Sequence, residues 1–288
     1  MISNWLLAAR PKTLIAGLSP ILIGTTFAID AGMFNAVTML FALLGAISVQ
    51  IGTNFCNDYC DFFQGADTEQ RKGPTRAVQS GLITPRSMLV ATVMMFTVTA
   101  LSALVLAYYA GWPFLLIGAL SILFGVLYTA SRFSLAYQGL GDPFVLVFFG
   151  PVAVAGTYYV QALELTSAVV ISGLGPGFLA VGLLVVNNLR DVEEDRAAEK
   201  KTLVVRFGVT LSRFQYSACI VSSVLVPIIV AILETDWWIT IASLVGIPGC
   251  MVVVKVWRSE GLQLRPCLGM TAGLLVLYTL LFCVGLAI

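Results

Sequence analysis

The chain has 288 residues, of which 59% are hydrophobic and 11% charged, and its mean hydropathy is +0.95. Soluble domains carry about 25% charged residues, so this composition excludes an ordinary soluble enzyme and a disordered protein. The net charge of +1 gives no broad positive surface for nucleic acid, and the absence of histidine excludes histidine general bases and most zinc chemistry. The sequence therefore predicts an integral protein of the lipid bilayer.

The apolar segments are long enough to cross a bilayer as helices, which requires about 20 residues each. A run of 45 residues without charge, 87–131, is twice that length, and a Gly-Trp-Pro turn at its centre divides it. The expected spans in chain order lie in 13–29, 31–57, the two halves of 87–131, 143–163, 165–189, 214–233, 237–254 and 266–288. We therefore predict an all-α, polytopic bundle of nine transmembrane helices that forms a single domain, residues 1–288.

The charged residues between these spans predict the orientation. With nine spans, all 16 Lys and Arg residues fall on one side of the membrane, and the opposite loops hold only Asp30, Glu164, Glu234 and Asp236. Short cytoplasmic loops carry the basic residues of membrane proteins. We therefore predict a multi-pass protein of the cell membrane, with the amino terminus in the cytoplasm and the carboxyl terminus outside.

Two basic-side loops, 54–81 and 187–208, are longer than the others and carry most of the acidic residues. They align with an offset of 133, and each begins at the end of an even-numbered span. Residues four and seven or eight apart share one face of a helix. Each loop therefore opens with one amide and two carboxylates on a common stripe, formed by Asn54, Asp58 and Asp61 in the first loop and by Asn187, Asp191 and Asp195 in the other.

These stripes predict a metal site with oxygen ligands. Carboxylates at the membrane boundary require a cation, and the six cysteines contain no Cys-x-x-Cys pair, so the hard cation Mg²⁺ is the natural candidate. Mg²⁺ prefers a few carboxylates together with phosphate oxygens. A phosphate-bearing substrate is therefore expected between the stripes, with basic residues downstream to bind a diphosphate. These residues are Arg71, Lys72, Arg76, Lys200, Lys201 and Arg206.

Two other interpretations are open. The acids in these loops can be ordinary solvated residues, although such loops have no reason to keep helical register twice. The chain can also be an ion-coupled membrane transporter, since carboxylates within membranes mark ion paths. Against the transporter, the acids lie on one side of the membrane, and breaks by Gly or Pro are not matched between the halves.

The two loops, together with the nine-span plan, resemble the UbiA-type intramembrane prenyltransferases over essentially the whole chain. The first loop contains N-D-Y-x-D, and the loop at 187–208 contains N-N-L-R-D-x-x-x-D-R-x-x-x-K-x-T-L-V-V-R-x-G. Both patterns are most similar to those of the prenyltransferases that act on 1,4-dihydroxy-2-naphthoate in menaquinone synthesis. Three shorter matches support the resemblance: Arg10-Pro11-Lys12-Thr13 at the first helix, Tyr128-x-x-x-Arg132, and the Gly-Leu-Gly-Asp run that ends at Asp142.

The resemblance implies Mg²⁺-dependent transfer of a polyprenyl group from its diphosphate to 1,4-dihydroxy-2-naphthoate, with loss of CO₂. Another aromatic acceptor, such as 4-hydroxybenzoate, is the alternative within the class. The expected partners are the two small-molecule substrates and the bilayer, with no nucleic acid, and no residue identifies the prenyl chain length. The metal ligands would be Asn54, Asp58, Asp61, Asn187, Asp191 and Asp195, with Asp67 as a further candidate. The carboxylates Asp58, Asp61, Asp191 and Asp195 would act in catalysis together with Tyr128 and Arg132. Lys72 and Lys201 would bind the diphosphate, and Arg10 or Arg76 would bind the carboxylate of the acceptor.

Overall fold

The computed structural model describes residues 2–64, 76–128 and 138–288, and within these ranges all regular secondary structure is helical. The elements are α1 (Ile2–Ala9), α2 (Pro11–Asp30), α3 (Ala36–Gln64), α4 (Pro85–Ala110), α5 (Pro113–Leu127), α7 (Gly141–Val147), the π-helix η1 (Phe148–Val152), α8 (Ala153–Ala162), α9 (Ser167–Ser172), α10 (Leu174–Arg190), α11 (Val192–Ala197), α12 (Leu203–Phe207), α13 (Val209–Glu234), the 3₁₀-helix η2 (Trp237–Val245), α14 (Gly246–Arg258), the 3₁₀-helix η3 (Gly261–Leu264) and α15 (Arg265–Ala287). The predicted all-α membrane bundle is confirmed.

Eight helical segments in the described part of the chain are long and apolar enough to cross a membrane, and each coincides with a predicted span. The remaining predicted span corresponds to α5, an apolar helix of 15 residues, which is shorter than these eight. The predicted count of nine full-length spans is therefore not confirmed. Helices dominate because a bilayer offers no hydrogen-bond partners, so each backbone N–H and C=O must be satisfied within its own segment.

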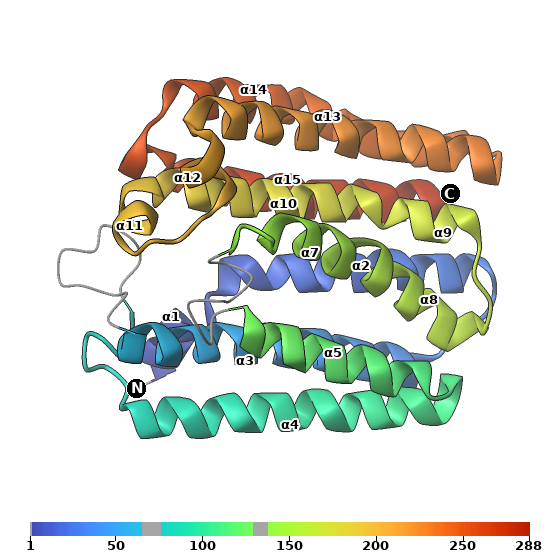
Figure 1. Ribbon diagram of the computed structural model, residues 1–288. Coiled ribbons are helices and arrows are strands. Elements are labelled where there is room, and N and C mark those ends of the chain that lie inside the picture. Colours follow the sequence, from blue (N-terminus) through green and yellow to red (C-terminus); the bar gives the residue numbers. More distant parts are fainter. Residues whose placement is uncertain (1, 65–75, 129–137) are drawn as a thin grey trace.

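The helices lie side by side in one bundle, with the amino and carboxyl termini at opposite ends (Figure 1). One group contains α3, α4 and α5, and the other contains α10, α13, α14 and α15, while α2, α7 and α8 lie between them in the view. The short helices α1, α11 and α12 lie at the same end of the bundle. The same end carries the ends of α3 and α10, where the two acidic motifs lie.

The segment from α7 to α8 bends sharply. Gly150, in the π-helix, has non-helical backbone angles (φ −120°, ψ −112°), and Pro151 follows it. A Cβ atom on Gly150 would lie 2.7 Å from the carbonyl oxygen of Gly173, so only glycine allows this close approach to the start of α10. π-helical turns and prolines are common causes of helix kinks. The bend directs α8 across to α2 (Figure 1).

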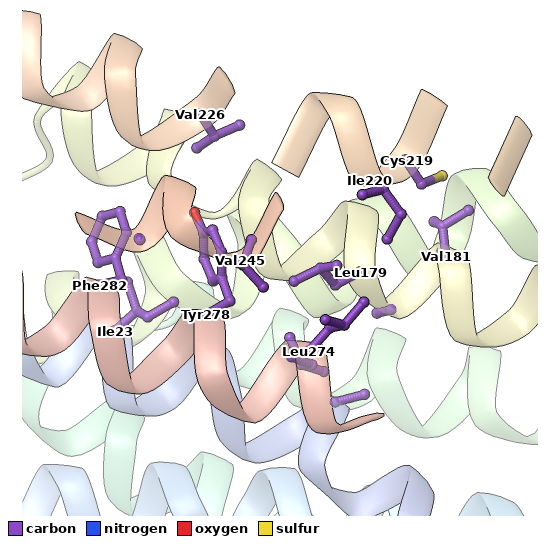
Figure 2. Packing of buried hydrophobic residues seen from close by; sticks show 14 of the residues in the cluster. Ile23, Leu179, Val181, Cys219, Ile220, Val226, Val245, Leu274, Tyr278 and Phe282 are labelled. Carbon is purple, nitrogen blue, oxygen red and sulfur yellow. The ribbon is translucent and has the colours of Figure 1, made fainter. Parts of the chain in front are cut away.

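The main core lies between α2, α10, α13 and α15. Ile23, Leu179, Tyr278 and Phe282 are fully buried there (Figure 2). Another apolar cluster joins α1 to the ends of α3 and α4 and includes an edge-to-face contact of Trp5 with Phe55. These two clusters hold the carboxyl-terminal ends of α10 and α3, and therefore both acidic motifs, in place.

Candidate active site

A single cavity of about 900 Å³ receives residues from both acidic motifs. This is near the upper end of the usual range for small-molecule sites, about 300–1,000 Å³. Its polar end contains both aspartate stripes, and its body is lined by apolar side chains from helices of both groups. The residues of the two stripes that line the cavity are Asn54, Asp58, Asp61, Asn187, Asp191 and Asp195.

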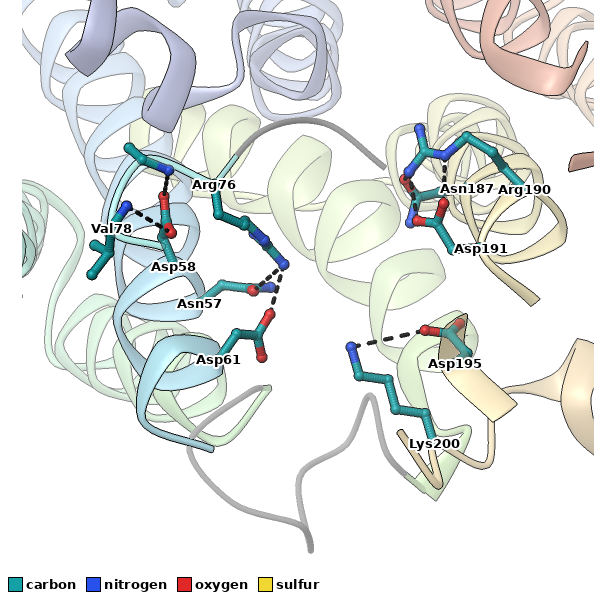
Figure 3. A network of polar contacts seen from close by, with 11 residues as sticks. Asn57, Asp58, Asp61, Arg76, Val78, Asn187, Arg190, Asp191, Asp195 and Lys200 are labelled. Carbon is teal, nitrogen blue, oxygen red and sulfur yellow. Dashed lines mark hydrogen bonds and ion pairs between the residues drawn. The ribbon is translucent and has the colours of Figure 1, made fainter. Parts of the chain in front are cut away.

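The first stripe lies on the continuous helix α3, as predicted. The buried carboxylate of Asp58 accepts hydrogen bonds from the backbone N–H groups of Ala77 (3.0 Å) and Val78 (3.4 Å) (Figure 3). Asp58 therefore holds the segment that leads into α4 against α3. The amide of Asn54 donates to the carbonyl of Ala9 (2.9 Å) and so ties the junction of α1 and α2 to the same helix.

Arg76 forms an ion pair with the last aspartate of the first motif. Its Nη2 atom lies 2.6 Å from Asp61 Oδ2 and 2.9 Å from Asn57 Oδ1, and the arginine and aspartate side chains are both nearly fully buried (Figure 3). The neighbouring positive charge of the guanidinium offsets the loss of hydration of this buried carboxylate. Arg76 lines the cavity beside Asp61, but its guanidinium contacts side chains of the protein.

The stripe of the other motif is not on one helix, contrary to the expected register. α10 ends at Arg190, Asp191 has non-helical backbone angles (φ −99°, ψ 13°), and α11 begins at Val192. Arg190 binds both carboxylate oxygens of Asp191, at 2.6 Å from Nε and 2.5 Å from Nη2, and also Asn187 Oδ1 at 2.8 Å. This two-pronged contact holds the Asp191 carboxylate at the cavity despite the break in the helix (Figure 3).

Lys200, and not Lys201, reaches the cavity. The Nζ atom of Lys200 lies 3.8 Å from Asp195 Oδ1, and both residues line the cavity (Figure 3). Lys201 is exposed and is not among the lining residues, so the structure does not place this predicted diphosphate-binding residue at the site. The two lysines are adjacent in sequence, and the turn after α11 decides which of them faces inward.

Tyr128 lies at the end of α5 and lines the cavity. A Cβ atom on Gly141 would lie 3.3 Å from the Tyr128 hydroxyl, which shows how closely the phenol packs against the start of α7. Removal of the phenol from water raises the pKa of Tyr128, and the negative charges of Asp142 and Asp195 raise it further. The hydroxyl is therefore a hydrogen-bond donor at neutral pH.

We expect that Tyr128 does not ionise as the pH is raised through about 10, the ordinary pKa of tyrosine. The folded state favours the protonated phenol of Tyr128. The contribution of this protonated phenol to the free energy of unfolding is therefore complete below about pH 10 and is lost only as the pH rises toward the raised pKa. A difference titration of tyrosinate absorbance between the wild type and Tyr128→Phe measures this directly. A tyrosinate signal from Tyr128 below pH 10 would contradict the expectation.

The donor set fits a magnesium ion that shares its ligands with a substrate. Within the described ranges, no three acidic or cysteine side chains form a ready-made metal cluster. The carboxylates instead face one cavity from two sides, held by Arg76, Arg190, Lys200 and backbone amides. Mg²⁺ binds through one or two carboxylates together with substrate phosphates more readily than in all-protein cages.

Arg190 and Asn57 belong to the site although no role was predicted for them; both lie within the two motifs that carry the resemblance. The position of Arg190, three residues after Asn187 and next to Asp191, is the sequence feature from which a local partner could have been predicted. Arg10, as expected, lines the cavity, and it is close enough to Asp58 for a favourable electrostatic interaction. Four predicted site residues lie outside the described residues: Asp67, Arg71, Lys72 and Arg132.

Comparison with known proteins shows similarity along most of the chain. The profile of the UbiA prenyltransferase family matches residues 17–270. The chain is 36% identical to the 1,4-dihydroxy-2-naphthoate octaprenyltransferase of Escherichia coli, over 98% of this chain and 94% of that protein. It is 39% identical to the enzyme of the same name from Mycobacterium tuberculosis, over 85% of this chain and 83% of that protein.

Solved structures show the same fold. A UbiA homolog from Archaeoglobus fulgidus, solved with GPP and Mg²⁺, superimposes with a TM-score of 0.68 at 17% identity, covering 97% of this chain and 99% of the homolog. The apo structure of a UbiA homolog from Aeropyrum pernix gives a TM-score of 0.70 at 13% identity, covering 99% and 98%. With two acidic motifs at one cavity of a multi-pass helical bundle and this similarity along its whole length, the chain belongs to the UbiA prenyltransferase family.

Proposed function

We propose that this protein transfers a polyprenyl group from polyprenyl diphosphate to 1,4-dihydroxy-2-naphthoate, with loss of CO₂ and formation of demethylmenaquinol. The observation that carries the proposal is the single cavity, which joins two carboxylate stripes at its polar end to an apolar body. A polyprenyl diphosphate has the same division between a charged head and an apolar tail. The names of the relatives support the choice of the naphthoate as acceptor.

The carboxylates Asp58, Asp61, Asp191 and Asp195, with Asn54 and Asn187, would hold Mg²⁺ at the diphosphate. Bound Mg²⁺ supplies positive charge that offsets the charge developing on the diphosphate as the allylic C–O bond breaks. Lys200 faces the same end of the cavity and would bind the leaving diphosphate. Lys72 and Arg132 remain candidates for this role from the resemblance alone.

Other residues of the cavity would bind the acceptor and protect the reactive allylic carbon. The Tyr128 hydroxyl, protonated at neutral pH, would donate a hydrogen bond to an oxygen of the diphosphate. Arg10 and Arg76 line the cavity near the first motif, and one or the other would orient the acceptor carboxylate. The ring carbon that bears this carboxylate attacks the allylic carbon; the new C–C bond forms, and release of CO₂ returns the electron pair of the broken bond to the ring. Apolar walls exclude water, which would otherwise capture the allylic cation.

The proposed orientation places the polar end of the cavity in the cytoplasm of the cell. All 16 basic residues fall on that side of the predicted topology, and short cytoplasmic loops are enriched in such residues. The amino terminus would then be cytoplasmic and the carboxyl terminus outside.

An assay with purified protein tests the function. A labelled polyprenyl diphosphate is supplied with 1,4-dihydroxy-2-naphthoate or with 4-hydroxybenzoate, in the presence of Mg²⁺ or of a chelator. We expect a decarboxylated, prenylated product from the naphthoate only, and its loss on removal of Mg²⁺. Product from 4-hydroxybenzoate alone would overturn the acceptor assignment, and no product from either acceptor with folded protein would overturn the prenyl transfer.

A further inference from the structure

An apolar wall lines the cavity at the side of the bundle opposite to the aspartates. Leu106 and Phe114 line the cavity close to the turn between α4 and α5. They are therefore remote from Pro85 and Leu127, the ends of these two helices that lie on the side of the aspartates. Ile21 and Ala42 also line the cavity, and these four residues belong to one buried cluster. Phe114 in turn stacks on Tyr159, with ring centroids 6.3 Å apart and ring planes inclined by 16°. The cluster therefore forms one apolar wall of the space available to a tail.

Gly156 of α8 lines the same cavity and has space in front of it. A Cβ atom built on Gly156 meets no atom within 4 Å. Two other cavity glycines are explained by packing: a Cβ on Gly118 would lie 2.5 Å from Ala103 Cβ, and one on Gly125 would lie 2.5 Å from Thr53 Oγ1. Glycine is a poor residue for a helix interior, and no neighbouring atom requires it at position 156. The absent side chain leaves cavity volume open.

The depth of Gly156 can be compared with the length of a prenyl chain. Gly156 follows Gly141, at the polar end beside Tyr128, by fifteen positions, which is at most about 22 Å at about 1.5 Å per residue, because the bend at Gly150 shortens the direct separation. An extended chain advances about 1.2 Å per backbone bond, so an isoprene unit with four such bonds spans about 5 Å. Two units, about 10 Å long, then end short of Gly156, whereas four units, about 20 Å long, reach it and eight units must pass it.

We propose that Gly156 is a specificity-determining residue for the length of the prenyl donor. The space in front of Gly156 accommodates the isoprene units from about the fourth onward, counted from the diphosphate. This inference rests on the proposed function, because it requires the diphosphate to bind at the aspartates. A side chain at position 156 would exclude long donors and leave short donors unaffected.

The test compares Gly156→Leu with the wild type for donors of two, four and eight isoprene units. We expect kcat/KM for the eight-unit donor to fall about tenfold or more, as for a misfit in an apolar pocket, with less than about a twofold change for the two-unit donor. Gly156→Ala, which adds a single carbon, should shift the ratio in the same direction by less. It also serves as the alternative variant should the leucine protein fail to fold.

Gly273→Leu is the matched control. Gly273 is also inside a transmembrane helix, α15, and a Cβ there also meets nothing within 4 Å, but it is exposed and does not line the cavity. This variant should treat the three donors as the wild type does. Equal loss of all three donors in the Gly156 variants, or no change in any donor, would overturn the proposal.

Binding measurements separate this inference from the proposed function. The affinities of the three donors are measured with Mg²⁺ and no acceptor, using wild type and Gly156→Leu in lipid nanodiscs. Weaker binding of the eight-unit donor alone, with no naphthoate product, would keep the length assignment and reject the proposed acceptor. Naphthoate product without any dependence on donor length would reject the length assignment alone. If no donor binds to the wild type, both fail.

Discussion

Asp191→Asn is expected to lower the rate of prenyl transfer by about two to three orders of magnitude. The asparagine keeps the shape of the side chain and one oxygen for Arg190, but it removes the negative charge that would bind Mg²⁺ at the diphosphate. The loss should appear in kcat with saturating donor. Steady-state rates of the purified variant in detergent or liposomes measure it.

Two controls accompany this variant. Asp30→Asn changes an exposed carboxylate at the other end of α2, remote from the cavity, and should retain the rate of the wild type. Thermal unfolding of Asp191→Asn should show that the protein is still folded. Normal prenyl transfer by folded Asp191→Asn would show that the motif at the end of α10 does not hold the metal and that the metal ligands lie on α3 alone.

Arg190→Ala is expected to lower the free energy of unfolding by about 3 kcal/mol. The side chains of Arg190 and Asp191 are 4% and 9% exposed, so solvent screens this ion pair little. Removal of the guanidinium leaves a nearly buried carboxylate without its counter-charge and also removes a hydrogen bond to Asn187. Denaturant or thermal unfolding in detergent gives the change in stability.

The matched control is Arg196→Ala, a short distance along the chain. Arg196 pairs with Glu193 at 3.1 Å, but these side chains are 59% and 76% exposed. Exposed pairs contribute about 0–1 kcal/mol, so this variant should change stability little. The double variant Arg190→Ala/Asp191→Asn should be less destabilised than the sum of the two single changes, because their partners are shared. Equal effects of Arg190→Ala and Arg196→Ala would contradict the role of the buried pair.

The membrane helices follow from local sequence, but some of their ends do not. Hydropathy located every long span, since a bilayer requires each helix to satisfy its own backbone and to be apolar over its own length. The predicted span 31–57 stops where the first charge occurs, whereas α3 continues to Gln64. The helix continues because the Asp58 and Asp61 side chains find partners in the segment before α4. That segment is adjacent only in the folded protein.

Within the site, the sequence by itself determined the residue types and their spacing. The repeated Asn and Asp positions at the ends of two apolar helices indicated oxygen ligands at one face of the membrane, because helical periodicity is a local property of the chain. Their convergence on one cavity was decided by the packing of the helix bundle. The pairing of Asp61 with Arg76, the break at Asp191 and the choice of Lys200 over Lys201 were likewise decided by contacts between elements. A buried charge takes whichever counter-charge the tertiary structure brings within reach, and linear spacing does not specify that partner.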